Sequence, residues 1–489
     1  MKIENFLEKH EIREITIFQK LVLSGGQLGY SDMVDYLDVS KASLDKDLEA
    51  IAFRFQSISS DVRIDYDGHM ISLSVSHEFS LEQIYQHYLR QSIKVSIISY
   101  LYEHQEFTIT QLAQKLTVSE SSLFRKIKEL NSYLKEFQIK IRNGRLQGEE
   151  LQIRYFYYQF YWYIADKSAL ASQKNDDQVE RMTQAMENFL QATFDSESKQ
   201  RMGVWFHISK NRVNSRSKVY KFLHQQMEPY HEDPMYHKVR TMVLRFFSRY
   251  SIEVDEEEGM MHFIFLLAFP ILSENDFHEY TLLRGRRTPT AALDTYIVET
   301  IIIQYNLRKL PYMLEREMYY FLSQIHTRMY FFKGDIEIYD YDAILAKEKK
   351  FTGKDLLSFA KQLRDISMGK LGIEETNGDT LLKMELLKYV SLLAIVTFQT
   401  TTVLQIGIDL KMESIYTKAL NQLLVMNMQH INGTHIEKYD PKKDYDLILT
   451  NVPKGQKDHY GKSKVYVLSE ILSPFDQKNI QEILQTLNQ

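Results

Sequence analysis

The sequence predicts a multidomain, mainly α-helical protein with two winged helix-turn-helix domains, two helical bundle modules and a C-terminal α/β domain with a parallel sheet. Three observations predict this architecture: a duplicated two-helix pattern near the N-terminus, long amphipathic helices in the middle, and apolar strands near the C-terminus. A chain of 489 residues is too long for one core, because domains average about 100–150 residues. We expect domains at residues 1–79, 80–165, 166–285, 286–399 and 400–489.

The two-helix pattern occurs twice. Val39–Leu44 (VSKASL) repeats as Val118–Leu123 (VSESSL), 79 residues further along the chain (118 − 39), and the flanking apolar residues repeat with the same offset. Helices in 11–23 and 81–104 would complete a three-helix unit in each copy. A hairpin pattern follows each copy, around Asp67-Gly68 in the first and Asn143-Gly144 in the second. Each copy is therefore predicted to be a winged helix-turn-helix.

The second copy carries a face that suits the major groove of DNA. Leu123, Ile127 and Leu130 share the inward side of its second helix, and Ser119 is placed to cap that helix. Polar and basic residues occupy the outward side and the hairpin, where cations attract phosphates and Ser or Arg can contact base edges. The expected DNA contacts of this copy are Ser121, Arg125, Lys126, Lys128, Lys140, Arg142 and Arg145.

Positive charge is concentrated in this second copy. Between Glu120 and Gly148 seven Lys and Arg residues accompany three Glu residues, a net charge of +4 (7 − 3), whereas the whole chain carries −5. Such a local basic patch is typical of a nucleic-acid contact surface. A helical hairpin followed by a β-hairpin without any ligand is the alternative interpretation.

The first copy is electrically balanced. Its predicted recognition helix contains three cations and three carboxylates, a net charge of zero (3 − 3), so its attraction for phosphate is weaker. The expected DNA contacts here are Lys41, Ser43 and Lys46. A degenerate dimerising or packing domain is the alternative for this copy.

Long amphipathic helices are predicted from residue 150 to about residue 399, with breaks near 228–234, 284–289 and 333–335. The aromatic run at 155–162 is expected to be core rather than a platform for stacking bases. After residue 399, apolar strands at 403–408, 447–450 and 465–468 alternate with helices at 414–426 and 474–487, which predicts a parallel sheet covered on both faces.

Composition excludes several classes of function. The chain contains no cysteine, so it has no disulfide, thiolate metal site or cysteine nucleophile. No glycine-rich phosphate loop, nucleophile elbow or paired metal-ligand histidines occur, and we expect neither enzymatic activity nor a cofactor nor a metal. The N-terminus lacks the apolar core of a signal peptide, and the apolar stretches are too short or too polar to span a bilayer. A cytoplasmic protein is expected.

The order of these domains resembles the Mga-type transcriptional regulators of Gram-positive bacteria. The residues that carry the resemblance are Val39–Leu44, Val118–Leu130 and Val204–Arg212 (VWFHISKNR). The resemblance implies a DNA-binding regulator, usually an activator of surface and virulence genes and of sugar metabolism, that forms homodimers or larger homo-oligomers. It also implies that the helical modules resemble regulation domains phosphorylated on histidine by the sugar phosphotransferase system, and that the last domain resembles enzyme IIB.

Two features depart from or qualify this pattern. Enzyme IIB carries phosphate on a cysteine after its first strand, but the corresponding loop Gly407–Lys411 has none, which favours a role in interaction or dimerisation. The candidate phosphorylation sites implied by the resemblance are His207, His262 and His326. His207 fits the family segment best, and Lys210, Arg212 and Arg216 follow it as possible phosphate partners.

Two further functions remain open beside a regulator that binds double-stranded DNA. The first is a phosphotransferase-linked RNA antiterminator, which would need an RNA-binding module, whereas the duplicated winged motif favours duplex DNA. The second is a non-catalytic phosphotransferase adaptor. Phosphocarrier proteins of the phosphotransferase system are expected partners if the histidines are phosphorylated, and no membrane partner is expected.

Overall fold

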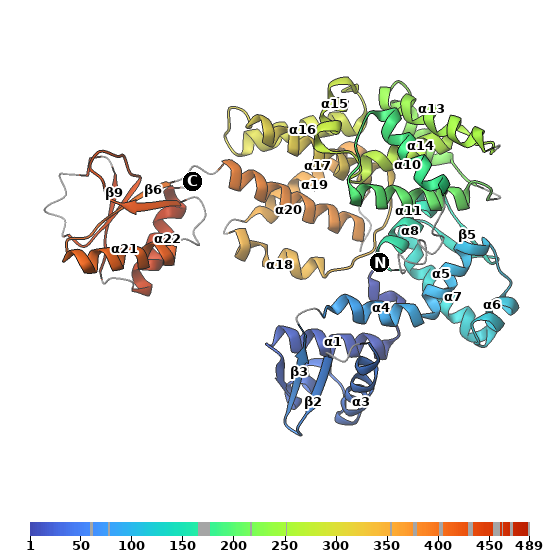
Figure 1. Cartoon of the computed structure of the whole chain (residues 1–489), viewed down its shortest axis with the longest axis horizontal. Helices are drawn as coiled ribbons and strands as arrows, with labels where there is room; N and C mark the ends of the chain where they lie inside the picture. The colour runs from blue at the N-terminus through green and yellow to red at the C-terminus, as the bar shows by residue number, and fades with distance from the viewer. Residues whose placement is uncertain are drawn as a thin grey trace. The chain divides into compact units, whose positions relative to one another are not determined.

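The computed structural model describes residues 1–58, 62–76, 79–164, 177–215, 218–250, 252–352, 355–374, 379–400, 404–428, 434–452, 460–461, 463–469 and 473–487 (Figure 1). Contacts divide the chain into two compact units, Met1–Val390 and Ser391–Gln489. The described part is mainly helical, with two small antiparallel sheets in the first unit and a parallel sheet in the second, so the predicted fold class is confirmed. Every helix among the described residues is too short or too polar to cross a bilayer.

The first winged helix-turn-helix is followed by one further helix. Its elements are η1 (Ile3–Phe6), α1 (Lys9–Leu23), β1 (Gln27–Gly29), α2 (Tyr30–Leu37), α3 (Lys41–Ile58), β2 (Val62–Tyr66), β3 (Met70–Val75) and α4 (Leu81–Gln91). The three strands form an antiparallel sheet in the order β1-β3-β2. Asp67 shapes the β2–β3 turn, since its Oδ1 accepts hydrogen bonds from the backbone N–H of His69 (2.9 Å) and Met70 (2.7 Å). The Asp-Gly hairpin predicted for this copy is present.

The second winged helix-turn-helix begins after an interruption of the helix at Ser92. Its elements are α5 (Ile93–His104), α6 (Ile109–Lys115), α7 (Glu120–Leu134), η2 (Lys135–Phe137), β4 (Lys140–Arg142) and β5 (Arg145–Gln147). The stretch 81–104 forms two helices because Ser92 is extended (φ −68°, ψ 125°), caps α5 and donates its hydroxyl to the carbonyl of Phe6 (2.6 Å). Helix α4 consequently packs against α1 and α3, and α5 opens the second copy.

The rest of the first unit is helical. Its elements are α8 (Glu150–Tyr163), α10 (Asp177–Leu190), α11 (Ser196–Arg212), α12 (Lys221–Met227), η3 (Glu228–Tyr230), α13 (Pro234–Arg249), α14 (Glu256–Ala268), α15 (Glu274–Leu283), α16 (Pro289–Gln304), α17 (Tyr312–Phe331), α18 (Tyr341–Thr352), α19 (Leu356–Leu371) and α20 (Thr380–Thr400), which runs past Val390 into the second unit. Helices end or begin at all three predicted breaks. The aromatic residues at 155–162 of α8 are buried, and Tyr155 stacks on Phe332 with ring centroids 4.3 Å apart, so this run is core as expected.

A buried ion network joins α8 to α11 and α14. The guanidinium of Arg154 donates to both carboxylate oxygens of Glu258 (2.7 and 2.6 Å) and to Glu150 (3.0 Å), and Arg212 donates to Glu150 (2.6 Å). All four side chains are buried, and each charge has an opposite partner, which is what makes burial of charge tolerable. The N-terminal segment of the chain also belongs to this unit, since the backbone of Ile3 pairs with Glu337.

The second unit is an α/β domain. Its elements after α20 are β6 (Leu404–Asp409), α21 (Ser414–Met428), β7 (Thr434–Lys438), β8 (Leu447–Thr450), β9 (Lys464–Val467) and α22 (Pro474–Leu487). All neighbouring strands are parallel, in the order β7-β6-β8-β9, which confirms the predicted parallel sheet. Strand β7 was not predicted, because its sequence THIEK is polar and it lies at the edge of the sheet.

Candidate nucleic-acid interface

The turn between α6 and α7 forms as the sequence predicts. Leu112 of α6 and Leu123 of α7 are fully buried, and the chain reverses at Thr117, whose φ of +55° lies in the left-handed region. The hydroxyl of Ser119 accepts a hydrogen bond from the backbone N–H of Ser122 (3.2 Å) and caps α7. The N-cap prediction for Ser119 is confirmed.

One side of α7 is open to solvent. Ser121, Phe124, Arg125 and Lys128 are all exposed, and their spacing of three and four residues puts them on one helical stripe. The stripe contains the three outward residues that the sequence predicts and one that it does not, since the large apolar side chain of Phe124 is 57% exposed. The polar members present a hydroxyl, a guanidinium and an ammonium group, the types that contact bases and phosphates.

Lys126 was predicted as a DNA contact, and the structure contradicts this prediction. Its side chain is buried, and its Nζ lies 2.5 Å from Oε1 of Glu8 at the start of α1. The physical reason is helical geometry: Lys126 follows Leu123 by three residues and precedes Leu130 by four, so it shares their inward face. That spacing was visible in the sequence, but the charged head group favoured an exposed position.

The hairpin after α7 is a two-residue turn held against the helices. Asn143 (φ +51°) and Gly144 (φ +69°) form the turn, and the Gly144 carbonyl accepts from the backbone N–H of Phe107 (3.0 Å). A Cβ on Gly144 would lie 1.9 Å from the Phe107 carbonyl oxygen, so only glycine fits there. The side chain of Asn131 on α7 also anchors the hairpin, because its amide exchanges two hydrogen bonds with the backbone of Ile141 (2.6 and 2.9 Å). Asn131 was not predicted.

The basic patch of the second copy remains after Lys126 is removed from it. Lys140, Arg142 and Arg145 on the hairpin are exposed, as are Arg125 and Lys128 on α7. Arg145 donates to Glu106 (2.6 Å), which pairs its charge but leaves it at the surface. The helix and the hairpin thus offer exposed cations from two elements that are fixed to each other.

The first copy presents a different surface. Lys41 and Lys46 are exposed, as predicted for DNA contacts, whereas Ser43 is half-buried near the cap of α3. Asp47, which aligns with Lys126 of the second copy, is likewise buried, and both of its carboxylate oxygens accept from Arg13 (2.8 and 2.9 Å). The same helix position is therefore internal in both copies.

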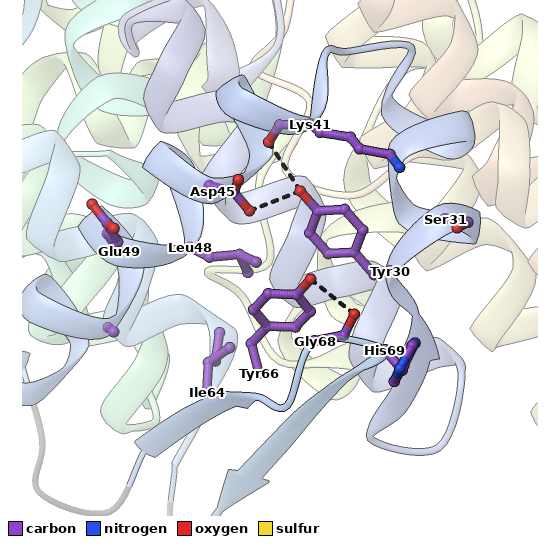
Figure 2. A pocket seen from close by; sticks show the side chains of 11 residues that line it. Tyr30, Ser31, Lys41, Asp45, Leu48, Glu49, Ile64, Tyr66, Gly68 and His69 are labelled. Carbon is purple, nitrogen blue, oxygen red and sulfur yellow. Dashed lines mark hydrogen bonds between the residues drawn. The ribbon is translucent and has the colours of Figure 1, made fainter.

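A cleft of about 790 Å³ lies between α3 and the β2–β3 hairpin of the first copy (Figure 2). The rings of Tyr30 and Tyr66 stack with centroids 4.8 Å apart, and the Tyr30 hydroxyl lies 2.7 Å from Oδ1 of Asp45 and 3.0 Å from the Lys41 carbonyl. Burial of the ring and the hydrogen bond to Asp45 raise the pKa of Tyr30 to about 12. Glu49 also lines the cleft, so two carboxylates occupy the side of α3 that corresponds to the basic side of α7.

Two of the three candidate histidines are buried. His262 on α14 places Nδ1 2.6 Å from the Glu258 carbonyl, and burial lowers its pKa to about 4. His326 on α17 lies between Oδ1 of Asp294 (2.6 Å from Nδ1) and the Tyr389 hydroxyl (2.7 Å from Nε2). Neither imidazole reaches the surface in this conformation.

The third candidate, His207 on α11, is half-buried. Lys210 is also half-buried. Arg212 is buried and donates to Glu150, so Arg212 could contact a phosphate on His207, as predicted, only by giving up its ion pair with Glu150. Arg216 lies outside the described residues. Within the described part of the chain, no cluster of three or more His, Asp or Glu side chains could hold a metal ion.

Comparison with known proteins identifies the second copy. Residues 77–161 match the family described as "Mga helix-turn-helix domain", so the chain contains a Mga-type helix-turn-helix domain. A Streptococcus pneumoniae serotype 4 protein named "Putative trans-acting regulator" is 20% identical over 162 residues, 32% of each chain. The Bacillus anthracis "Capsule synthesis positive regulator AcpB" is 34% identical over 74 residues, 15% of each chain. The aligned stretches therefore cover at most 32% of either relative.

Proposed function

We propose that this chain, which contains a Mga-type helix-turn-helix domain, is a DNA-binding regulator that activates transcription. The observation that carries the proposal is the exposed face of α7 beside the basic hairpin β4–β5. In this proposal α7 enters the major groove through its N-terminal turns, and the hairpin contacts the adjacent backbone.

The charges of the two copies support unequal contributions to DNA affinity. Arg125 and Lys128 can neutralise phosphates from α7, and each such contact releases condensed counterions and strengthens binding at low salt. In the first copy the cations Lys41 and Lys46 stand beside the carboxylates of the α3 cleft, which repel phosphate. The second copy supplies most of the affinity, and the first copy positions the protein on the duplex.

Activation, location and assembly are finer parts of the proposal. The similarity to AcpB, which is named a positive regulator, supports activation rather than repression. The protein works in the cytoplasm as a homodimer or larger homo-oligomer, which places several winged units on one long DNA site. The enzyme IIB-like parallel domain, without a cysteine, serves in this assembly rather than in phosphate transfer.

Histidine phosphorylation by the sugar phosphotransferase system is the proposed control. His207 is the most accessible of the three candidates, whereas His262 and His326 would need local opening of α14 or α17 before a phosphocarrier protein could reach them. A phosphoryl group adds a charge of roughly −1.5 to −2 and can reset contacts between helices. We expect His207→Asp to change oligomer size, measured by light scattering, and reporter output, with His207→Ala changing them in the opposite direction. Unchanged size and output in both variants would contradict this control.

DNA binding is tested by fluorescence anisotropy on a duplex selected from a random-sequence library with the purified protein. The wild type should bind this duplex and be displaced by duplex DNA rather than by a structured RNA hairpin. The double variant Arg125→Ala/Lys128→Ala should lose more affinity than the matched double variant Lys41→Ala/Lys46→Ala, because the second copy holds the basic patch. Preferential displacement by RNA, or equal losses in the two variants, would refute the assignment.

A further inference from the structure

Phe124 is an unusual residue for the surface that it occupies. Its side chain is 57% exposed although it is large and apolar, and it lies on α7, the helix proposed to enter the groove. Leu123 and Leu130 fill the buried side of the same helix, so the fold has no need of a further apolar residue on the outer side. Single exposed aromatic rings are common on protein surfaces, and Phe53 is more exposed still, so exposure alone indicates nothing. It is the position of Phe124 on the face of α7 proposed to meet DNA that points to a contact with a partner.

The neighbours of Phe124 are those of a base-contacting side chain. Arg125 is adjacent, Ser121 precedes Phe124 by three residues and Lys128 follows it by four, and all are exposed on the same stripe. Phe124 also belongs to the N-terminal half of α7, the part of a recognition helix that contacts base edges. In the major groove the one apolar group that a base pair offers is the C5-methyl of thymine.

The equivalent position of the first copy carries a carboxylate, which cannot make such an apolar contact. Phe124 aligns with Asp45 (124 − 79), and Asp45 is held by the Tyr30 hydroxyl in the cleft shown in Figure 2. Lys128 likewise aligns with Glu49, which lines that cleft. The apolar, basic face is thus particular to the second copy.

We propose that Phe124 contacts the C5-methyl group of a thymine in the bound DNA and determines the base preference at that position. The proposal rests on the proposed function, because it assumes that α7 enters the major groove. Arg125 and Lys128 hold the helix on the phosphates, and the ring of Phe124 distinguishes thymine from cytosine and from uracil, which lack the methyl group.

A double-mutant cycle tests the contact. Wild-type protein and the variant Phe124→Ala are titrated against the selected duplex and against duplexes in which each thymine in turn is replaced by deoxyuridine, which removes only the methyl group. At one position the wild type should lose about fourfold in affinity, the factor for burial of one methyl group. Phe124→Ala should bind the thymine duplex at least as weakly as the wild type binds the deoxyuridine duplex. Replacing that thymine by deoxyuridine should then cause no further loss of affinity in the variant.

The matched control is Phe53→Ala. Phe53 on α3 is 79% exposed, but it aligns with Ser132, beyond the N-terminal half of the recognition helix, so this variant should keep the full methyl dependence of the wild type. Because both rings are exposed, neither substitution should alter the thermal melting of the protein, and melting curves check this.

Four results would overturn the proposal. If the wild type binds duplex DNA without methyl dependence at any thymine, or if Phe124→Ala keeps that dependence, the contact is wrong while the proposed function stands. If Phe124→Ala changes the oligomer size and leaves the methyl dependence intact, Phe124 is a protein–protein contact. If the wild type binds no duplex DNA, the proposed function fails together with this inference.

Discussion

Lys126 and Lys128 lie two residues apart on α7, and the structure predicts opposite consequences for their substitution. Lys128 is exposed beside Arg125, whereas the Lys126 side chain is 8% exposed and paired with Glu8. We therefore expect Lys128→Gln to weaken DNA binding without affecting stability, and Lys126→Gln to lower stability without affecting the salt dependence of binding. The two variants remove the same charge and differ only in where the charge lies.

The size of the DNA effect follows from counterion release. Each phosphate contact contributes about −0.9 to the slope of log K against log salt concentration, so Lys128→Gln should make the slope shallower by about 0.9. The factor by which Lys128→Gln weakens binding should therefore be about 3.5 times larger at roughly 50 mM salt than at roughly 200 mM salt. Fluorescence anisotropy over a series of KCl concentrations measures the slope.

The size of the stability effect follows from the ion pair. Burial alone would raise the pKa of the Glu8 carboxyl, but the hydrogen bond and charge of Lys126 outweigh it and lower that pKa. Because Glu8 remains 42% exposed and keeps much of its hydration, loss of the pair should cost only about 1 kcal/mol. Calorimetry should show a lower Tm for Lys126→Gln and for Glu8→Gln, with little further loss in the double variant. An unchanged Tm with a shallower salt slope in Lys126→Gln would refute the buried position of Lys126.

Three further substitutions test the hairpin and the helical core. Gly144→Ala should lower both Tm and DNA affinity, because the added methyl group meets backbone, whereas Gly68→Ala in the open turn of the first hairpin should cost only about 1 kcal/mol; equal effects would contradict the packed turn. Asn131→Ala should weaken DNA binding by releasing the hairpin from α7, while Ser132→Ala should be neutral in the same anisotropy assay. Because the pKa of His262 is about 4 in the folded state and near 6.5 unfolded, the unfolded chain binds the proton first as pH falls, so stability should decrease by roughly 3 kcal/mol between pH 6.5 and 4. Melting curves of His262→Gln should show that Tm falls less with decreasing pH over that range than in the wild type. If Tm falls as steeply in the variant, His262 is not the source of the pH dependence.

Local patterns were enough to predict most of the architecture. Three features depend on contacts between residues close in sequence, and all three form as expected: the inward spacing of Leu123 and Leu130, the Ser119 cap and the Asn143-Gly144 turn. The apolar strand β6 also follows from its own composition. These features depend on helix and turn geometry that a short segment determines by itself.

Features that depend on distant segments were missed. The stretch 81–104 is continuous in its helical pattern, and its break at Ser92 depends on a hydrogen bond to Phe6, 86 residues earlier in the chain. The polar strand β7 becomes a strand because β6 offers it a hydrogen-bonding edge. Asn131 is only ten residues from Ile141, but its role was missed too, because it depends on how the hairpin folds back against α7 after η2.

The sequence by itself determined that two winged units precede a helical region and a parallel α/β domain, because helical periodicity, capping and turn residues act over a few residues. The sequence also placed Lys126 between Leu123 and Leu130 on the inward face, but only the tertiary structure decided that a charged group is accommodated there. Lys126 and Lys128 have the same chemistry. Helical spacing turns Lys126 inward and Lys128 outward, and Glu8 of the first winged unit supplies the opposite charge that makes burial of the Lys126 ammonium group tolerable. A side chain's charge is local information, but its burial depends on which distant segment packs against it.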